Sequence, residues 1–157
     1  MAAAPQEGDR APNFKLETDA GDTVSLSKHK GHAVVLYFYP KDDTPGCTKE
    51  AIAFTGALPK FDKAKVTVIG VSKDSCASHA KFREKYTLSH TLAADEDGKV
   101  CNAYGVWIEK NLYGKKSMGI ERATFLIDAK GVVRNVWHRV SVDGHVDEVL
   151  AAARALK

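Results

Sequence analysis

Residues Ala33 to Tyr39 form a run that is apolar at every position and ends at Pro40. So short an apolar run is typical of a strand that is covered on both faces of a sheet. A second run of this kind spans residues 66–71, and the segment 47–61 between them has apolar residues at helical spacing, with a bend or restart expected at Pro59. A strand, a helix and a second buried strand predict a parallel pair with a right-handed crossover, which indicates an α/β fold.

The other predicted elements extend this sheet on both sides. Alternation in residues 14–17 and 24–26, around a turn at 19–22, predicts an N-terminal hairpin. Asp74 or Ser75 can cap a helix that runs to about Tyr86. The order β-α-β-α-β-β-α is that of a thioredoxin-like fold with an added N-terminal β-hairpin and a mixed central sheet flanked by helices. The later elements expected are a short helix at 99–104, a hairpin of strands 123–127 and 132–137, and a closing helix at 146–156.

Length and composition predict a single domain spanning residues 1–157. A chain of 157 residues that is 44% hydrophobic and 27% charged can bury a real core. Its 23 basic and 20 acidic residues are interleaved, which predicts a solvated surface and no nucleic-acid partner. No apolar run approaches the roughly 18 residues that a membrane span requires, and residues 1–10 lack the pattern of a signal peptide. We therefore expect a cytoplasmic protein without a membrane partner.

The cysteines are Cys47, Cys76 and Cys101, an odd and sparse set that makes a poor disulfide framework for a secreted domain. No two have CxxC spacing, and no histidine lies close enough to a cysteine to suggest a zinc site. We expect neither a metal nor a bound cofactor. The thiols are either all reduced and buried, or at least one of them is reactive.

Cys47 lies in the segment 39–50, where the first buried strand ends and a helix begins. Open α/β sheets bind their ligands at this edge. Unpaired N–H groups and the positive end of the helix dipole favour a thiolate over a thiol in the first helical turn. The alternative is a small buried residue at a helix start. The two prolines and the glycine of the loop, with the Thr44 hydroxyl three residues before the sulfur, favour a nucleophile.

The spacing Pro40-x-x-x-Thr44-x-x-Cys47 matches the PxxxTxxC signature of peroxiredoxins. The fuller text FYPKDDTPGCTKE resembles their peroxiredoxin Q subgroup, also called bacterioferritin comigratory proteins. The resemblance covers nearly the whole chain and places Arg122 at the position of the family's essential arginine. It implies a thiol-dependent peroxidase with a thioredoxin-like fold and no metal or cofactor. The further stretches that carry it are Gly70–Ser72, Asp95–Gly98, Tyr104–Trp107 and Gly119–Asp128.

The resemblance implies a role for each of four residues around Cys47. Arg122 would favour the thiolate and hold the peroxide oxygens with several N–H donors. The Thr44 hydroxyl would exchange a hydrogen bond with the peroxide, and Pro40 would fix the loop and shield the site from water. Glu50 would orient the arginine. Without the resemblance, Arg122 is interpreted as a surface arginine, Thr44 as a helix cap and Glu50 as an acid that complements the helix dipole.

Resolution of the oxidised cysteine departs from the family pattern. Attack on a peroxide leaves a sulfenic acid on Cys47, and the positions that the family uses to resolve it are held here by Ile52 and Arg83. Cys76 begins the helix that contains Arg83, and both helix starts are expected at one sheet edge. We predict Cys76 as the resolving cysteine after backbone movement. A one-cysteine enzyme reduced by an external thiol is the alternative, and Cys101 is expected to be structural.

The histidines show no pattern of pairing with a nucleophile. His79 lies on a face of the predicted helix and is expected to be solvated. A general-base histidine is not required, because a thiolate already exists at neutral pH.

Together these features predict a peroxidase for hydrogen peroxide and small organic hydroperoxides. Thioredoxin or a similar dithiol would recycle it, and it would act as a monomer or weak homodimer. A thioredoxin-fold disulfide oxidoreductase is disfavoured because CxxC is missing, and a non-catalytic module or holdase with the same fold remains the alternative from another class.

Overall fold

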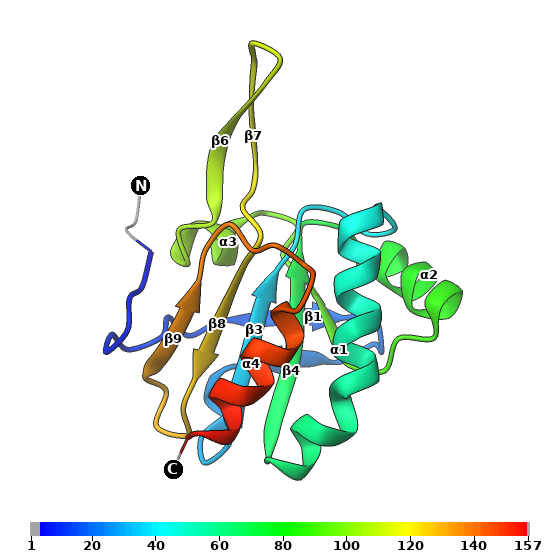
Figure 1. The fold of residues 1–157 in the computed structure, drawn as a ribbon. Helices are drawn as coiled ribbons and strands as arrows, with labels where there is room; N and C mark the ends of the chain where they lie inside the picture. Colours follow the sequence, from blue (N-terminus) through cyan, green and yellow to red (C-terminus); the bar gives the residue numbers. More distant parts are fainter. Residues whose placement is uncertain (1–3, 157) are drawn as a thin grey trace.

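The computed structural model describes residues 4–156 and confirms a mixed α/β architecture (Figure 1). Most predicted elements are present within a residue or two of their expected bounds. The helices are α1 (Pro45–Lys63), α2 (Cys76–Tyr86), α3 (Lys99–Ala103) and α4 (His145–Arg154), with a 3₁₀ turn, η1, at Ser27–His29. The strands are β1 (Lys15–Thr18), β2 (Thr23–Ser25), β3 (Ala33–Phe38), β4 (Val66–Ser72), β5 (Thr91–Ala94), β6 (Trp107–Leu112), β7 (Lys115–Ile120), β8 (Ala123–Ile127) and β9 (Val133–Trp137).

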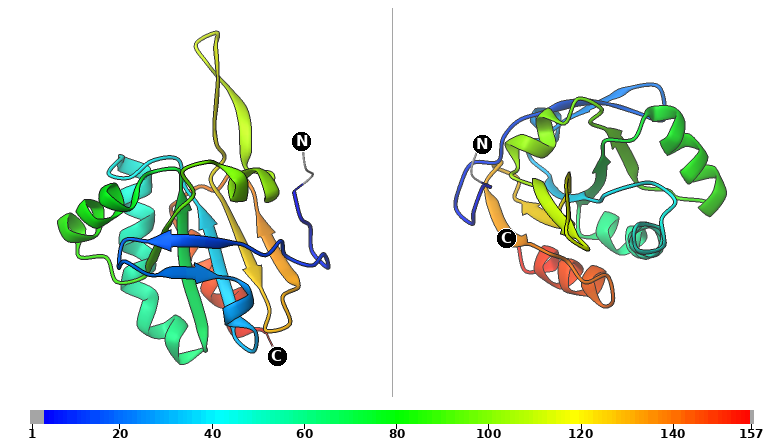
Figure 2. Two further views of the ribbon diagram at one scale, coloured as in Figure 1. Left: turned by 180° about the vertical axis from the view of Figure 1, so that it is seen from behind. Right: turned by 90° about the horizontal axis from the view of Figure 1, so that it is seen from above.

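Seven strands form the central sheet, in the order β2-β1-β5-β4-β3-β8-β9. Strand β3 is parallel to β4 on one side and antiparallel to β8 on the other. Helices α1 and α4 lie on one face of the sheet, while the N-terminal segment crosses the opposite face (Figure 1, Figure 2). Val35 and Tyr37 of β3 pack in the cluster that includes α1 and α4, and Leu36 packs in the other. This double coverage explains why β3 is apolar at every position.

Helix α1 is longer than predicted. It begins at Pro45 and runs through Pro59 to Lys63 without ending at the proline. Helix α2 begins at Cys76 with Ser75 as its cap, because the Ser75 side chain accepts a hydrogen bond of 3.1 Å from the Ser78 N–H. Ser75, of the two predicted candidates, is thus the capping residue.

The hairpin of β6 and β7 was not predicted. It projects from the body of the protein (Figure 1), and its strands pair only with each other among the described residues, from Trp107 opposite Ile120 to Leu112 opposite Lys115. Tyr113 and Gly114 turn the chain with φ angles of 54° and 79°, as tight hairpin turns require. Strand β5 was also missed, because four residues ending in two alanines give a weak strand signal.

Within residues 4–156, no helix combines the length and the apolar character needed to cross a membrane.

Candidate active site

The candidate site begins where β3 ends and the chain turns into α1. Thr44 holds the N-cap position with an extended backbone (φ −100°, ψ 155°). Pro45 follows at the first helical position, where its missing N–H breaks no helical hydrogen bond. Cys47 therefore lies in the first turn of α1, as predicted, and its side chain is buried.

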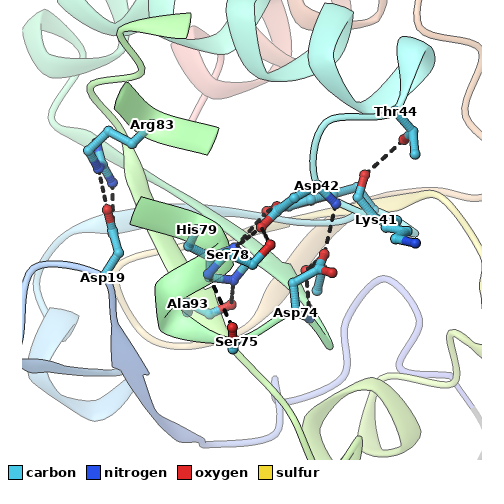
Figure 3. A network of polar contacts seen from close by, with 12 residues as sticks. Asp19, Lys41, Asp42, Thr44, Asp74, Ser75, Ser78, His79, Arg83 and Ala93 are labelled. Atoms are coloured by element: carbon cyan, nitrogen blue, oxygen red, sulfur yellow. Dashed lines mark hydrogen bonds and ion pairs between the residues drawn. The ribbon is translucent and has the colours of Figure 1, made fainter. Parts of the chain in front are cut away.

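The Thr44 side chain does not cap α1, although its backbone holds the cap position. Its hydroxyl donates to the carbonyl oxygen of Lys41 at 2.8 Å (Figure 3). This bond uses the single hydrogen of the hydroxyl, so the oxygen of Thr44 is left to accept from a ligand.

Arg122 joins Cys47 and Glu50. Its Nη2 nitrogen donates to the Cys47 sulfur at 3.2 Å, and its Nη1 nitrogen donates to Glu50 Oε1 at 2.7 Å. The backbone carbonyl of Arg122 accepts from Val140 at 3.0 Å, which fixes the chain just before β8. The guanidinium thus presents one edge to the sulfur and is held from behind by a carboxyl group.

Burial is the largest single influence on the pKa values of Glu50 and Arg122, although it is outweighed at Arg122. Burial raises the pKa of Glu50 to about 7, against the opposing effect of the Arg122 charge and hydrogen bond. The second oxygen of Glu50 is buried and has no hydrogen-bond partner among residues 4–156. Burial also lowers the pKa of Arg122, but Glu50 and Cys47 outweigh it and the net pKa is raised. Arg122 therefore stays fully charged next to the sulfur.

Gly46 and Lys110 lie near the guanidinium of Arg122. A Cβ atom at Gly46 would lie 3.1 Å from Arg122 Nη2, so only glycine leaves this contact relaxed. Lys110, on the unpredicted strand β6, is close enough for burial and Arg122 to lower its pKa and for Cys47 to oppose that shift. Pro40 is half-buried in the loop after β3.

The other two cysteines lie elsewhere, and all three thiols are free. Cys76 is the first residue of α2, at the same sheet edge as Cys47, because the preceding strands β3 and β4 are parallel neighbours. Among residues 4–156, the side-chain hydrogen bonds of Cys47 and Glu50 go to Arg122 and not to Cys76. Cys101 is buried in α3, where burial first and Asp95 second raise the pKa of its thiol far above the ordinary value.

Positions 52 and 83, at which the family places a resolving cysteine, have different surroundings in this structure. Ile52 is 47% exposed on the outer side of α1. Arg83 holds α2 to the N-terminal hairpin through Asp19, with Nε to Oδ2 at 2.5 Å and Nη2 to Oδ1 at 3.0 Å (Figure 3). It also donates to the carbonyl oxygens of Leu88 and His90. Arg83 thus binds α2 to the segments on either side of it.

The prediction that His79 is solvated was wrong. The side chain is fully buried, three residues before the buried Phe82 on the same face of α2. A polar ring is tolerated there because each nitrogen has a partner: Nδ1 lies 2.7 Å from Asp42 Oδ2, and Nε2 lies 3.0 Å from the carbonyl oxygen of Ala93 (Figure 3). The spacing to Phe82 was the signal that the sequence offered.

In the described part of the chain, residues 4–156, histidine, cysteine and acidic side chains form no group of three that could hold a metal ion.

Comparison with known proteins places the chain in a family. A model of the AhpC/TSA family matches residues 7–136. The chain is 55% identical to the putative peroxiredoxin Bcp of Coxiella burnetii over 143 residues. The match covers 91% of this chain and 95% of that protein. It is 48% identical over 143 residues to peroxiredoxin Bcp of Bacillus subtilis, covering 91% of each.

Solved structures agree. Peroxiredoxin Q of Xanthomonas campestris has a TM-score of 0.88 at 44% identity, covering 98% of this chain and 97% of that one. A structure of the bacterioferritin comigratory protein of the same organism, from work on its alkyl peroxide reduction activity, also matches. It has a TM-score of 0.88 at 43% identity and covers 99% of this chain and 98% of that one. Fold and relatives together define a thiol-dependent peroxidase of the thioredoxin-like class. The chain belongs to the AhpC/TSA family, and its similar members are Bcp and peroxiredoxin Q proteins.

Proposed function

We propose that Cys47 is the peroxidatic cysteine and that it reduces hydrogen peroxide and small organic hydroperoxides. The observation that carries this proposal is the 3.2 Å contact between the Cys47 sulfur and Arg122 Nη2 in the first turn of α1. A permanent cation and the helix N-terminus both favour a thiolate at this sulfur. The alkyl peroxide reduction activity of the similar Xanthomonas campestris protein supports the inclusion of organic hydroperoxides.

The chemical step is a displacement on oxygen. The Cys47 thiolate attacks one oxygen of the peroxide, so a sulfur–oxygen bond forms while the oxygen–oxygen bond breaks. The sulfur is oxidised to a sulfenic acid, and the second oxygen leaves as hydroxide or alkoxide and takes a proton to become water or an alcohol. Negative charge grows on the leaving oxygen, which is the charge that fixed donors must stabilise.

The neighbouring residues divide this task. Arg122 supplies fixed N–H donors to the thiolate and to the peroxide oxygens. Thr44 accepts from the peroxide, since its own hydrogen is held by the Lys41 carbonyl. Glu50 orients Arg122 through the 2.7 Å bond, and Pro40 shapes the loop and limits the access of water.

Cys76 is the resolving cysteine of this proposal. Its thiol attacks the sulfenic sulfur, a disulfide forms and water leaves. Support comes from the parallel pairing of β3 and β4, which brings the starts of α1 and α2 to one edge of the sheet. The first turn of α2 must open for the two sulfurs to meet, and helix ends open at small cost.

Direct reduction by an external thiol is the second candidate, and one observation favours it. Burial, together with the charges of Glu17 and Glu96, raises the pKa of the Cys76 thiol. Little Cys76 thiolate is then present at neutral pH, and the thiolate is the attacking species. On this route the sulfenic acid of Cys47 forms its disulfide with the external thiol.

Thioredoxin or a similar dithiol returns the enzyme to the reduced state on either route. The proposal also includes a cytoplasmic location and action as a monomer or weak homodimer, without a nucleic-acid or membrane partner.

The experiment follows oxidised Cys47 in the parent and in Cys76→Ser. If Cys76 resolves, peroxide-treated parent yields a linked Cys47–Cys76 peptide by mass mapping. Cys76→Ser should then accumulate a sulfenic acid that dimedone traps, and its turnover with thioredoxin, thioredoxin reductase and NADPH should fall sharply.

Equal turnover of the two proteins, with no linked peptide, assigns resolution to the external thiol. If dimedone never labels Cys47 and no disulfide of Cys47 forms after peroxide treatment, the proposed role of Cys47 itself is overturned.

A further inference from the structure

Asp42 lies in the loop between β3 and α1 (Figure 3). Its side chain accepts hydrogen bonds from the residue that follows β3 and from helix α2. Its carboxylate accepts from the Tyr39 hydroxyl at 2.6 Å, from the Ser78 hydroxyl at 2.8 Å and from His79 Nδ1 at 2.7 Å. Its backbone N–H donates to Asp74 Oδ2 at 2.8 Å. This loop residue is therefore held at both its side chain and its backbone, and the carboxylate is almost fully buried.

His79 is the only partner of Asp42 in this set that can carry a positive charge. Both of its ring nitrogens face acceptors, the Asp42 carboxylate on one side and the Ala93 carbonyl at 3.0 Å on the other. A neutral imidazole has one N–H, so it would direct a lone pair at one of the two acceptors. Only the imidazolium satisfies both contacts. The pair is thus a buried cation and anion with additional hydrogen bonds.

The pair is connected to the proposed site through one carbonyl group. Lys41 immediately precedes Asp42, and its carbonyl oxygen accepts the Thr44 hydroxyl at 2.8 Å. Holding Asp42 fixes the peptide group between residues 41 and 42, and this group contains that carbonyl. The orientation of the Thr44 hydroxyl therefore depends on a contact made by α2.

We propose that His79 is a positioning residue for peroxide reduction: as an imidazolium it holds Asp42, and through the Lys41 carbonyl it fixes the hydroxyl of Thr44. This inference rests on the proposed function, because it assigns a task to the same Cys47 site. His79 touches neither the substrate nor the reacting sulfur, so it acts only through the loop.

The Asp42–His79 pair predicts that the rate of Cys47 oxidation depends on the protonation of His79. Burial lowers the pKa of His79, but the hydrogen bond and charge of Asp42, the Ala93 carbonyl and the charge of Asp74 outweigh burial, and the pKa is raised above 6.5. Tyr39, which directly follows β3, faces the pair as a neutral phenol, because burial raises its pKa well above the ordinary value of a tyrosine. A group with a raised pKa contributes fully below its unfolded value, and the contribution is lost as pH rises through the folded value. The loop should therefore loosen on the alkaline side.

The test measures the second-order rate constant for oxidation of Cys47 by hydrogen peroxide, in a single turnover, across pH. Gln places its amide near Nε2 and loses the donor to Asp42, so His79→Gln should be about 10- to 100-fold slower. Asn places its amide near Nδ1 and keeps a neutral donor to Asp42. A neutral donor holds the carboxylate less strongly than an imidazolium does. His79→Asn should therefore recover only part of the rate, and its rate should lack the alkaline decline of the parent.

Ser75→Ala is the matched control, because it removes the side-chain cap of the same helix and Ser75 itself makes no hydrogen bond to Asp42. It should lower stability and keep the rate and its pH profile. If Ser75→Ala slows oxidation as much as His79→Gln does, loosening of α2 explains the effect and the positioning role is overturned. His79→Gln with the rate of the parent overturns it as well.

A spectroscopic measurement on the parent keeps the inference testable if the His79 variants do not fold. The ¹⁵N chemical shifts of the His79 ring should show two protonated nitrogens at neutral pH, and a ring with one N–H overturns the proposal. Failure of the proposed function looks different, since Cys47→Ser would then still reduce peroxide, whatever His79 does.

Discussion

The Nη2 nitrogen of Arg122 lies 3.2 Å from the sulfur of Cys47, although 75 residues separate them in the sequence. The pairing of two strands explains this proximity. Ala123, the first residue of β8, lies opposite Phe38, the last residue of β3. The residue before β8 is thereby brought to the sheet edge where α1 begins, so the arginine reaches the first helical turn from the antiparallel side of the sheet.

Replacing Arg122 with lysine tests this contact. The charge is kept, but the planar fork that joins Cys47 and Glu50 is lost. Removal of one preorganised donor at a developing charge costs about 100- to 1,000-fold in rate, and we expect oxidation of Cys47 by peroxide to slow by that factor. Stopped-flow kinetics at matched pH measure it. Arg134→Lys is the control: Arg134 is an exposed arginine that pairs with Asp128, and its replacement should not change the rate. Arg122→Lys within a factor of three of the parent would remove Arg122 from the site.

Gly46→Ala should separate stability from activity. Alanine in place of glycine in a helix usually stabilises it by about 1 kcal/mol, yet the new Cβ would lie 3.1 Å from Arg122 Nη2 and displace the guanidinium. We expect an unchanged or higher unfolding midpoint in urea together with peroxide reduction that is slower by about tenfold or more.

Gly56→Ala is the matched control for this substitution. It makes the same change in the same helix, where a Cβ meets no atom within 4 Å. It should stabilise the protein without changing the rate. Equal rates for Gly46→Ala and Gly56→Ala would show that the space beside Arg122 does not matter.

Glu50 makes stability depend on pH. A carboxyl whose pKa rises from 4.5 to about 7 on folding binds more protons in the folded state, so stability falls as pH increases between these values. Relative to Glu50→Gln, the parent should lose about 2 kcal/mol of unfolding free energy between pH 5 and pH 8. Urea unfolding at both pH values measures the difference. Parallel pH dependence of the two proteins would mean that Glu50 does not titrate in this range.

The sequence predicted the sheet well because its central strands have to be apolar. Residues of β3 and β4 are buried from both sides, and this requirement is visible in the composition of the two runs. The hairpin of β6 and β7 has no such requirement. Its residues are mostly exposed and pair with each other, so neither a buried run nor a clean alternation identifies the strands.

The site was predicted unevenly for a similar reason. The loop, Thr44 and Cys47 lie next to one another in the sequence, so their spacing carries a recognisable pattern. The Asp42–His79 pair joins two elements across 37 residues, and single-sequence patterns contain no information about such a contact. His79 was expected in solvent from its place on a face of the predicted helix, but packing of α2 against β5 buries it.

The most direct test of the account is the reduction of one equivalent of hydrogen peroxide by the pre-reduced protein without any recycling system. The parent and Cys76→Ser should each consume about one equivalent in the first turnover and label with dimedone or form a disulfide at Cys47. Cys47→Ser should fold and consume no peroxide, because the substitution is nearly isosteric but removes the thiolate. Stoichiometric consumption of peroxide by Cys47→Ser would contradict the assignment of the reacting sulfur.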